Sequence, residues 1–141
     1  MPAEDPFDLQ RFVTAQAGAY DRVLAELRRG YKESHWIWFV FPQIRGLGRS
    51  PTAARFAISS RQEAQAYLQH ALLGPRLREC TRLVTAIEGR TIRQILGAPD
   101  DLKFRSSMTL FAHVTADNKI FLDALDKYFG GEFDAATLAR L

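Results

Sequence analysis

The stretch from Lys32 to Ser50, KESHWIWFVFPQIRGLGRS, decides the fold class and holds the first candidate site. Its centre, WIWFVF, places apolar side chains on every side of any helix drawn through residues 36–41. A helix that is apolar all round is a buried one. A proline and a loop with two glycines follow the run. The polar side chains of Lys32, His35 and Gln43 therefore flank a core element, and buried polar groups need partners.

On both sides of this stretch, apolar residues recur at the spacing of helices rather than of strands. Ambiguous strand character is confined to a short run at residues 39–44. Helices are predicted over residues 6–30, 34–41, 51–56, 60–71, 74–88, 91–96, 99–114, 117–129 and from residue 134 onward. The sequence thus predicts an all-α fold in which residues 1–141 form a single compact helical domain of about seven to nine helices, several of them short.

Local signals mark several of the predicted helix ends. Ser34 is a candidate cap for the tryptophan-rich helix, and Ser50 precedes a first-turn proline. Ser60 and Glu63 fit the capping-box pattern. Asp134 is a candidate cap for the last helix.

Composition sets limits on the class of protein. Apolar content of 47% and charged content of 25% are ordinary for a soluble globular protein. No apolar run approaches the roughly 20 residues of a membrane helix, and the acidic start MPAEDPFD lacks signal-peptide features. Cys80 is the only cysteine, which excludes an intrachain disulfide and cysteine-rich metal sites. We expect a cytoplasmic protein without a membrane partner.

Charge is unevenly distributed along the chain. Residues 28–105 carry 14 Lys/Arg against 6 Asp/Glu, a balance of +8, whereas the two ends carry 5 against 10. A basic centre between acidic ends favours an anionic ligand, although the same pattern is also typical of solvated surface arginines. No Lys/Arg run is long enough for a nucleic-acid arm, and no recognition helix stands out. Nucleic acid is therefore the least favoured partner.

The first candidate site lies in the organising stretch. His35 is the residue type most readily tuned to titrate near neutral pH, so it is a candidate acid or base. Trp36 or Trp38 could stack on a flat ligand, and Gln43 could hydrogen-bond to it. The structural alternative is a hydrogen-bonded core histidine with indoles that serve only for packing.

The second candidate site is DDLKFRSSMTLF, residues 100–111. On a helix, Asp100, Lys103 and Ser107 fall nearly on one line, and Ser106 lies beside it. Lysine as base and serine as nucleophile would be a hydrolase arrangement, but known serine-lysine enzymes have S-x-x-K rather than this order. The same side chains could cradle a phosphate, or could bond backbone carbonyls as serines in helices often do.

Other signatures are missing from the sequence. It contains no phosphate-binding loop of the form G-x-x-x-x-G-K-[ST], no dinucleotide fingerprint, no G-x-S-x-G and no H-E-x-x-H. The three histidines, His35, His70 and His113, are widely spaced. We therefore predict no metal site and no cofactor.

Motifs along nearly the whole chain resemble those of the DUF1810 family, and the chain is similar to the Rv1873-like all-helical group. They are SHWIWFVFPQIRGLGRS, EAQAYLQHALLGPRL, DDLKFRSSMTLF and GEFDAATL. The resemblance implies a compact helical domain. The family is uncharacterised, so the resemblance implies no activity and no catalytic residues. Many motif positions are polar, which favours either a buried hydrogen-bond network or a ligand pocket.

The hypothesis drawn from these residues is a small helical protein that binds, and could hydrolyse, an anionic nucleotide-like molecule. Lys32, Lys103 and Arg76 would neutralise its charge, with Arg76 forking onto a phosphate. The remaining ligand contacts and catalytic roles would come from Trp36, Trp38, Gln43, Ser106, His35, Lys103 and Ser107. The alternatives are a non-catalytic protein-interaction module, whose partner the sequence does not identify, and a nucleic-acid binder. Whether the protein is an enzyme is left open.

Overall fold

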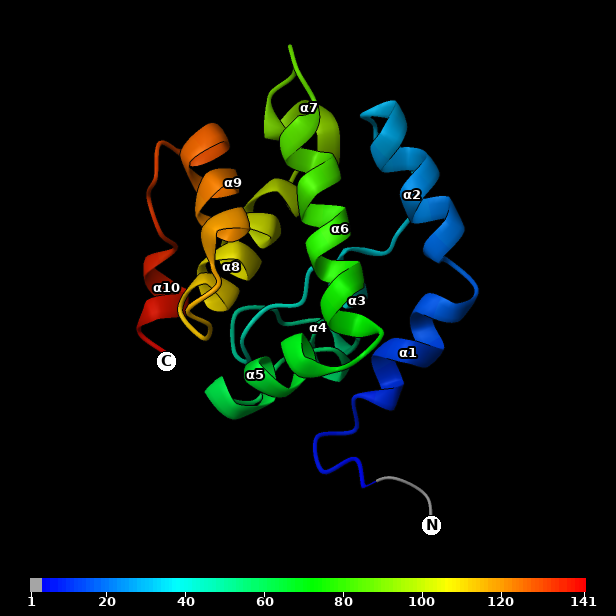
Figure 1. Ribbon diagram of the computed structural model, residues 1–141, viewed down its shortest axis with the longest axis vertical. Helices are drawn as coiled ribbons and strands as arrows, with labels where there is room; N and C mark the ends of the chain where they lie inside the picture. Colours follow the sequence, from blue (N-terminus) through cyan, green and yellow to red (C-terminus); the bar gives the residue numbers. More distant parts are fainter. Residues whose placement is uncertain (1–3) are drawn as a thin grey trace.

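Ten helices make up the part of the chain that this computed structural model describes, residues 4–141. Met1, Pro2 and Ala3, the start of the acidic N-terminal stretch, lie outside the described residues. In chain order the helices are α1 (Gln10–Ala17), α2 (Tyr20–Arg29), α3 (Ile37–Val40), α4 (Pro51–Arg55), α5 (Arg61–Gln69), α6 (Leu73–Ala86), α7 (Ile92–Leu96), α8 (Asp100–Ala112), α9 (Lys119–Phe129) and α10 (Ala135–Leu138) (Figure 1). The predicted all-α class is confirmed. Within the same residues, no helix combines the length and the apolar character that a bilayer crossing requires.

The long helix predicted over residues 6–30 is wrong, because the chain forms α1 and α2 instead. Gly18 and Ala19 leave the regular helical conformation between them. The residues before α1 are not helical either, and the Asp5 carboxylate accepts the backbone N–H groups of Leu9 and Gln10 at 2.8 and 2.9 Å. The apolar stripe continues across the break, so periodicity alone does not reveal it.

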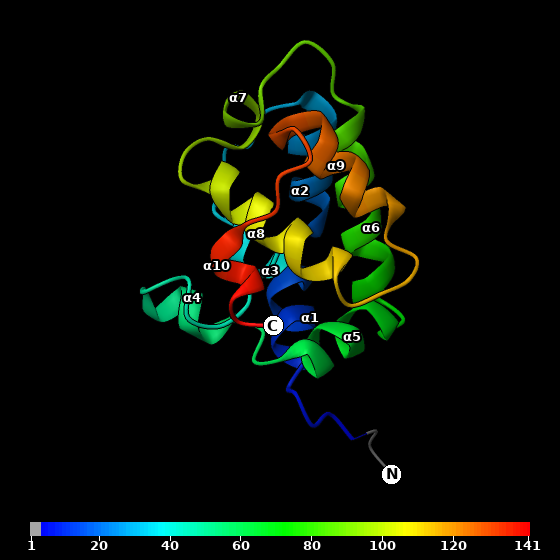
Figure 2. The same ribbon diagram turned by 90° about the vertical axis from the view of Figure 1, so that its left-hand side faces the viewer.

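α8 is the central helix, and α3, α5, α7, α9 and α10 all pack against it (Figures 1 and 2). Its side chains from residue 106 to residue 112 are buried without interruption, so this helix has no solvent-facing side in its second half. α6 packs against α2, α5 and α9. The DDLKFRSSMTLF motif is therefore the core helix of the molecule.

Aromatic rings join the organising stretch to α8. Phe41, which follows α3, meets Phe104 edge-on, with ring centroids 4.9 Å apart and planes at 87°. Phe12 and Tyr67 make a similar contact between α1 and α5, at 5.0 Å and 88°. Edge-to-face pairs of this kind are favourable beyond their buried area. The end of α3 is thus held against α8, and Phe39 within α3 also contacts the Phe56 ring, with centroids 5.5 Å apart.

Ser34 does not cap the tryptophan-rich helix as predicted. α3 begins at Ile37 with Trp36 at the cap position and no side-chain cap. The Ser34 hydroxyl instead donates to the buried Glu26 carboxylate of α2, which also accepts the Trp36 indole N–H at 2.9 Å. A local helix-cap signal has been overridden by a partner on another helix.

Other helix ends agree with the local signals. The Ser50, Ser60 and Asp134 side chains accept the N–H groups of Ala53, Glu63 and Thr137, so each caps its helix as predicted. The capping box at Ser60 is incomplete, because the Glu63 carboxylate bonds elsewhere.

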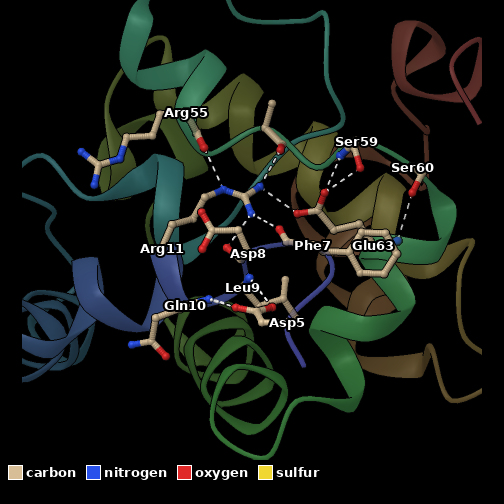
Figure 3. A network of polar contacts seen from close by, with 11 residues as sticks. Asp5, Phe7, Asp8, Leu9, Gln10, Arg11, Arg55, Ser59, Ser60 and Glu63 are labelled. Carbon is tan, nitrogen blue, oxygen red and sulfur yellow. Dashed lines mark hydrogen bonds and ion pairs between the residues drawn. The ribbon is translucent and has the colours of Figure 1, made fainter. Parts of the chain in front are cut away.

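The Glu63 carboxylate belongs to a network of hydrogen bonds that is centred on Arg11 of α1 and is shown in Figure 3. The Arg11 guanidinium donates to the Glu63 carboxylate at 2.7 Å and to the carbonyls of Phe7, Asp8, Arg55 and Ala57. The Glu63 side chain is 3% exposed. The network attaches the N-terminal segment to the connection between α4 and α5.

The loop after α3 forms one wall of the candidate site. An isolated bridge joins Ile44 to Ile58, and the Gln43 carbonyl accepts the Ile58 N–H at 2.8 Å. Gly46 has a φ of +99°, and a Cβ there would lie 2.5 Å from the Arg140 guanidinium. At Gly48 a Cβ would lie 2.4 Å from that of Ala53, so only glycine allows this approach of the loop to α4.

Candidate functional site

Three of the predicted site residues come together where α3, the loop after it and α8 meet. The Lys103 ammonium lies 4.9 Å from the centroid of the Trp38 ring. Gln43 lines the same region from the loop. A lysine over an indole face is held by the ring quadrupole as well as by any carboxylate nearby. The sequence placed these residues in two separate motifs, and the fold joins the motifs into one site.

Two neighbouring pockets open at this place, and they share Gln43 and Gly48. The first, of about 180 Å³, is lined by small and apolar residues together with Trp38 and Arg45. The second, of about 270 Å³, is lined by Lys103 and by Leu47, Pro99, Leu102, Ser106, Asp134 and Ala136. We call these the indole pocket and the lysine pocket.

Two lysines share a single carboxylate beside the lysine pocket. Lys32 lies 2.7 Å from one oxygen of Asp100, and Lys103 lies 3.6 Å from the other. The Lys32 side chain is 5% exposed, and its ammonium also donates to the Ser34 carbonyl at 2.6 Å. The trio of Lys32, Asp100 and Lys103 therefore carries one net positive charge. Lys103, which is 22% exposed, is the member that reaches the lysine pocket.

Free hydrogen-bonding capacity remains at the indole pocket. The Trp38 indole N–H is buried and has no acceptor within residues 4–141. A buried donor without a partner costs about 1–3 kcal/mol. The Gln43 side chain also makes no hydrogen bond within the described chain, while its backbone is fixed by the bond to Ile58.

Ser106 lies at the lysine pocket but is already bonded. Its hydroxyl is 3.1 Å from the Leu102 carbonyl and 3.0 Å from the Asp134 carboxylate. Asp134 also accepts the N–H and hydroxyl of Thr137 as the cap of α10. Both side chains thus serve first to attach α10 to α8.

The remaining predicted site residues lie elsewhere. His35 is exposed and lines none of the pockets found within residues 4–141. Trp36 is 1% exposed, so its ring has no free face. Arg76 is on α6, where it bonds the Gln16 side chain at 3.3 Å and covers the Tyr20 ring at 4.1 Å. Ser107 is completely buried, and its hydroxyl has no partner within the described residues.

Cys80 offers no alternative nucleophile. It is completely buried on α6, and this burial raises the pKa of its thiol to about 12. Only a thiolate is a strong nucleophile, so this cysteine is a packing residue at neutral pH.

The sequence placed Asp100 on one line with Lys103 in the second candidate site, but it did not identify Asp100 as the partner of either lysine. It did not identify Arg45 and Gly48 as site residues. The spacing of Asp100 and Lys103, three residues apart on a helix, is a signal that could have identified their pairing. The contact of Asp100 with Lys32 has no local signal, because the two residues are far apart in the chain. Arg45 and Gly48 enter only through the path of the loop.

Comparison with known proteins identifies the family. The model of DUF1810, described as a protein of unknown function, matches residues 6–141, so the chain belongs to this family. The fold is similar to the crystal structure of the conserved hypothetical protein Rv1873 from Mycobacterium tuberculosis, with a TM-score of 0.96 and 62% identity. That match covers 97% of this chain and 98% of the other. No curated protein matches the chain.

Proposed function

We propose that this DUF1810 protein binds a small phosphate-bearing molecule across the indole and lysine pockets. The observation that carries the proposal is the sharing of one carboxylate, Asp100, by Lys32 and Lys103. The shared carboxylate neutralises only one of the two ammonium groups. Lys103, which carries the remaining positive charge, lines the lysine pocket, where an anion would pair with it. The Asp134 carboxylate also lines this pocket, but it already accepts hydrogen bonds from Ser106 and Thr137.

The sizes of the two pockets indicate which part of such a ligand each pocket would hold. A cavity of about 150 Å³ is large enough for benzene, so the indole pocket of about 180 Å³ suits a single flat ring or a group of that size. Trp38 and Phe56 line it, and both offer aromatic surface. The phosphate would then lie in the lysine pocket against Lys103, with Gln43 between the two groups. A nucleoside monophosphate would fit this division with one ring of its base in the indole pocket and with the rest of the base and the ribose between the two pockets.

The proposal is limited to binding. A serine hydrolase would need Ser107 within hydrogen-bond reach of a base, and the Ser107 hydroxyl has no partner in residues 4–141. Lys103 lies against Asp100 and the Trp38 ring instead. His35 lines neither pocket.

Isothermal titration calorimetry with adenosine monophosphate, ribose 5-phosphate and adenosine tests the proposal. We expect both phosphate esters to bind and Lys103→Met to weaken them about tenfold or more, because a charge-assisted contact contributes about 1.5–3 kcal/mol. Adenosine is expected to bind weakly in both proteins. Lys119→Met is the matched control, since Lys119 is 85% exposed on α9 and pairs only with Asp123.

Thermal unfolding of each variant separates loss of the site from loss of the fold. The proposal fails if neither phosphate ester binds the wild-type protein at millimolar concentration. It also fails if folded Lys103→Met binds them as tightly as the Lys119→Met control does.

A further inference from the structure

A second basic pocket lies at the end of the molecule where α2 ends and α7 lies, at the top of Figure 1. Its volume is about 610 Å³, and Tyr31, Lys32, Arg90, Arg93 and Gln94 line it together with two glycines. No carboxylate is among the lining residues that the structure describes. We propose that this pocket, which we call the arginine pocket, binds the diphosphate group of a small molecule.

The charges in the arginine pocket are largely uncompensated. The Arg93 side chain is exposed and makes neither a hydrogen bond nor an ion pair within residues 4–141. Arg90 donates only to the Gly30 carbonyl, at 3.3 Å, and has no carboxylate partner in the same residues. Lys32 differs from both, because Asp100 neutralises it at 2.7 Å. Two guanidinium groups are therefore available to an anion.

The walls of the pocket are fixed before any ligand arrives. Gly30 turns the chain at the end of α2 with a φ of +77°, and the Arg90 side chain packs against it. The Lys32 N–H then donates to the Ile95 carbonyl of α7 at 2.7 Å, which holds the neighbouring Tyr31 beside the arginines. Thr91 and Gln94 form a complete capping box at the start of α7. The backbone of the site therefore needs little reorganisation, and the exposed Arg93 side chain is the part that a ligand would order.

The chemistry of the lining residues identifies the ligand class. Each guanidinium can fork onto one phosphate group, so two of them suit a diphosphate rather than a single phosphate. The volume falls within the range of about 300–1,000 Å³ that is typical of small-molecule sites. Arg28 lines an adjoining pocket that shares Arg90 and extends the positive field. Arg29 lines that pocket too but is paired with Glu33 at 3.2 Å, and Glu88 is also among its lining residues. The half-exposed Tyr31 ring would accept a base in a nucleoside diphosphate, whereas inorganic diphosphate would use the arginines alone.

Calorimetric titration with adenosine diphosphate, inorganic diphosphate and adenosine distinguishes a nucleoside diphosphate from inorganic diphosphate as the ligand. Arg93→Gln is the first variant, because the exposed Arg93 side chain makes no hydrogen bond or ion pair in the described chain, so we expect its loss to leave the fold intact. We expect it to weaken diphosphate binding about tenfold, and Arg90→Gln/Arg93→Gln to abolish it. Arg82→Gln, an exposed arginine on α6 that lines none of the pockets found, is the control.

Lys103→Met separates this site from the one proposed above. Because a phosphate group is also expected to bind at the lysine pocket, each titration is repeated in the Lys103→Met background, where only binding at the arginine pocket is expected to remain, since Lys103 does not line it. Tighter binding of adenosine diphosphate than of inorganic diphosphate, with the difference lost in Tyr31→Ala, supports the nucleoside source. Equal binding of both supports inorganic diphosphate. Absence of diphosphate binding, adenosine binding as tight as that of its diphosphate, or full affinity in Arg90→Gln/Arg93→Gln overturns the proposal.

Discussion

Glu26 is a buried carboxylate that holds the organising stretch against α2. It accepts the N–H groups of Glu33 and Ser34 at 2.8 and 3.0 Å, the Ser34 hydroxyl and the Trp36 indole. Burial alone would raise the pKa of Glu26, but these hydrogen bonds outweigh burial and lower the pKa to about 2. The ionised carboxylate is therefore part of the folded structure.

Because the pKa of Glu26 is depressed on folding, its contribution to stability is present above the ordinary value of 4.5 and is lost as pH falls toward about 2. The shift corresponds to about 3 kcal/mol. We expect Glu26→Gln to lower the free energy of unfolding by about that amount at pH 7, and the difference from wild type to shrink between pH 4.5 and 2. Urea unfolding at several pH values measures both.

Glu33→Gln is the matched control for this prediction. Glu33 is 61% exposed and pairs only with Arg29, so its loss should change stability by about 0.5 kcal/mol or less. A Glu26→Gln variant as stable as Glu33→Gln at pH 7 would contradict the structural role given to Glu26.

The contacts of individual polar residues were the part of the site that the sequence predicted least well. The motifs contain four residues that line adjoining pockets, namely Trp38, Gln43, Lys103 and Ser106. The ring of Trp36 was indistinguishable from that of Trp38 in the sequence, because burial depends on which way a four-residue helix turns. The function of these residues stays a prediction.

At the scale of elements, the sequence predicted best what local chemistry determines. The caps at Ser50 and Asp134 were predictable because the partner N–H lies three residues away. The break at Gly18 was not predictable, because the apolar stripe continues through it. The start of α3 was not predictable either, because Ser34 bonds to the distant Glu26 carboxylate instead of capping the helix. Nine predicted helices became ten through the division of the first one.

Gly74 in the first turn of α6 provides a prediction about how elements pack. Alanine usually stabilises a helix relative to glycine by up to about 1 kcal/mol. Here a Cβ would lie 2.1 Å from the Leu68 carbonyl oxygen of α5. This oxygen is a backbone atom, so it cannot rotate away as the end of a side chain would. We therefore expect Gly74→Ala to destabilise the protein by about 1–3 kcal/mol in urea unfolding.

Gly18→Ala is the counterpart, since nothing lies within 4 Å of the added Cβ and the glycine has a negative φ of −98°. It should be neutral or stabilise by about 0.4–1 kcal/mol. Equal effects at Gly18 and Gly74 would mean that α5 and α6 do not approach each other as closely as described.

At the scale of the whole molecule, the basic centre of the sequence becomes two pockets at different places on the surface. Lys103 lines the lysine pocket and Lys32 lines the arginine pocket. Asp100 lies between them and bonds both lysines. Asp100 therefore limits the positive charge that both pockets present, and it also stabilises the nearly buried Lys32. In the lysine pocket Asp134 is a second carboxylate.

Replacing this carboxylate should separate stability from anion binding. Asp100→Asn removes the partner of a lysine that is 5% exposed, and breaking such a pair costs about 3–5 kcal/mol when it is fully buried. The same change removes a repulsive charge next to both pockets. At an effective dielectric constant of about 20, the interaction of two unit charges about 10 Å apart amounts to about 1–2 kcal/mol, or roughly tenfold in affinity. We expect a lower melting temperature together with tighter binding of adenosine monophosphate and adenosine diphosphate. Calorimetry well below that temperature measures the binding, and at high salt the gain in affinity should diminish.

Asp123→Asn, which removes an exposed carboxylate paired with Lys119, should change neither property. Weaker anion binding in folded Asp100→Asn would show that the carboxylate positions the lysines for the ligand rather than opposing it, and the electrostatic basis of both pockets would have to be abandoned.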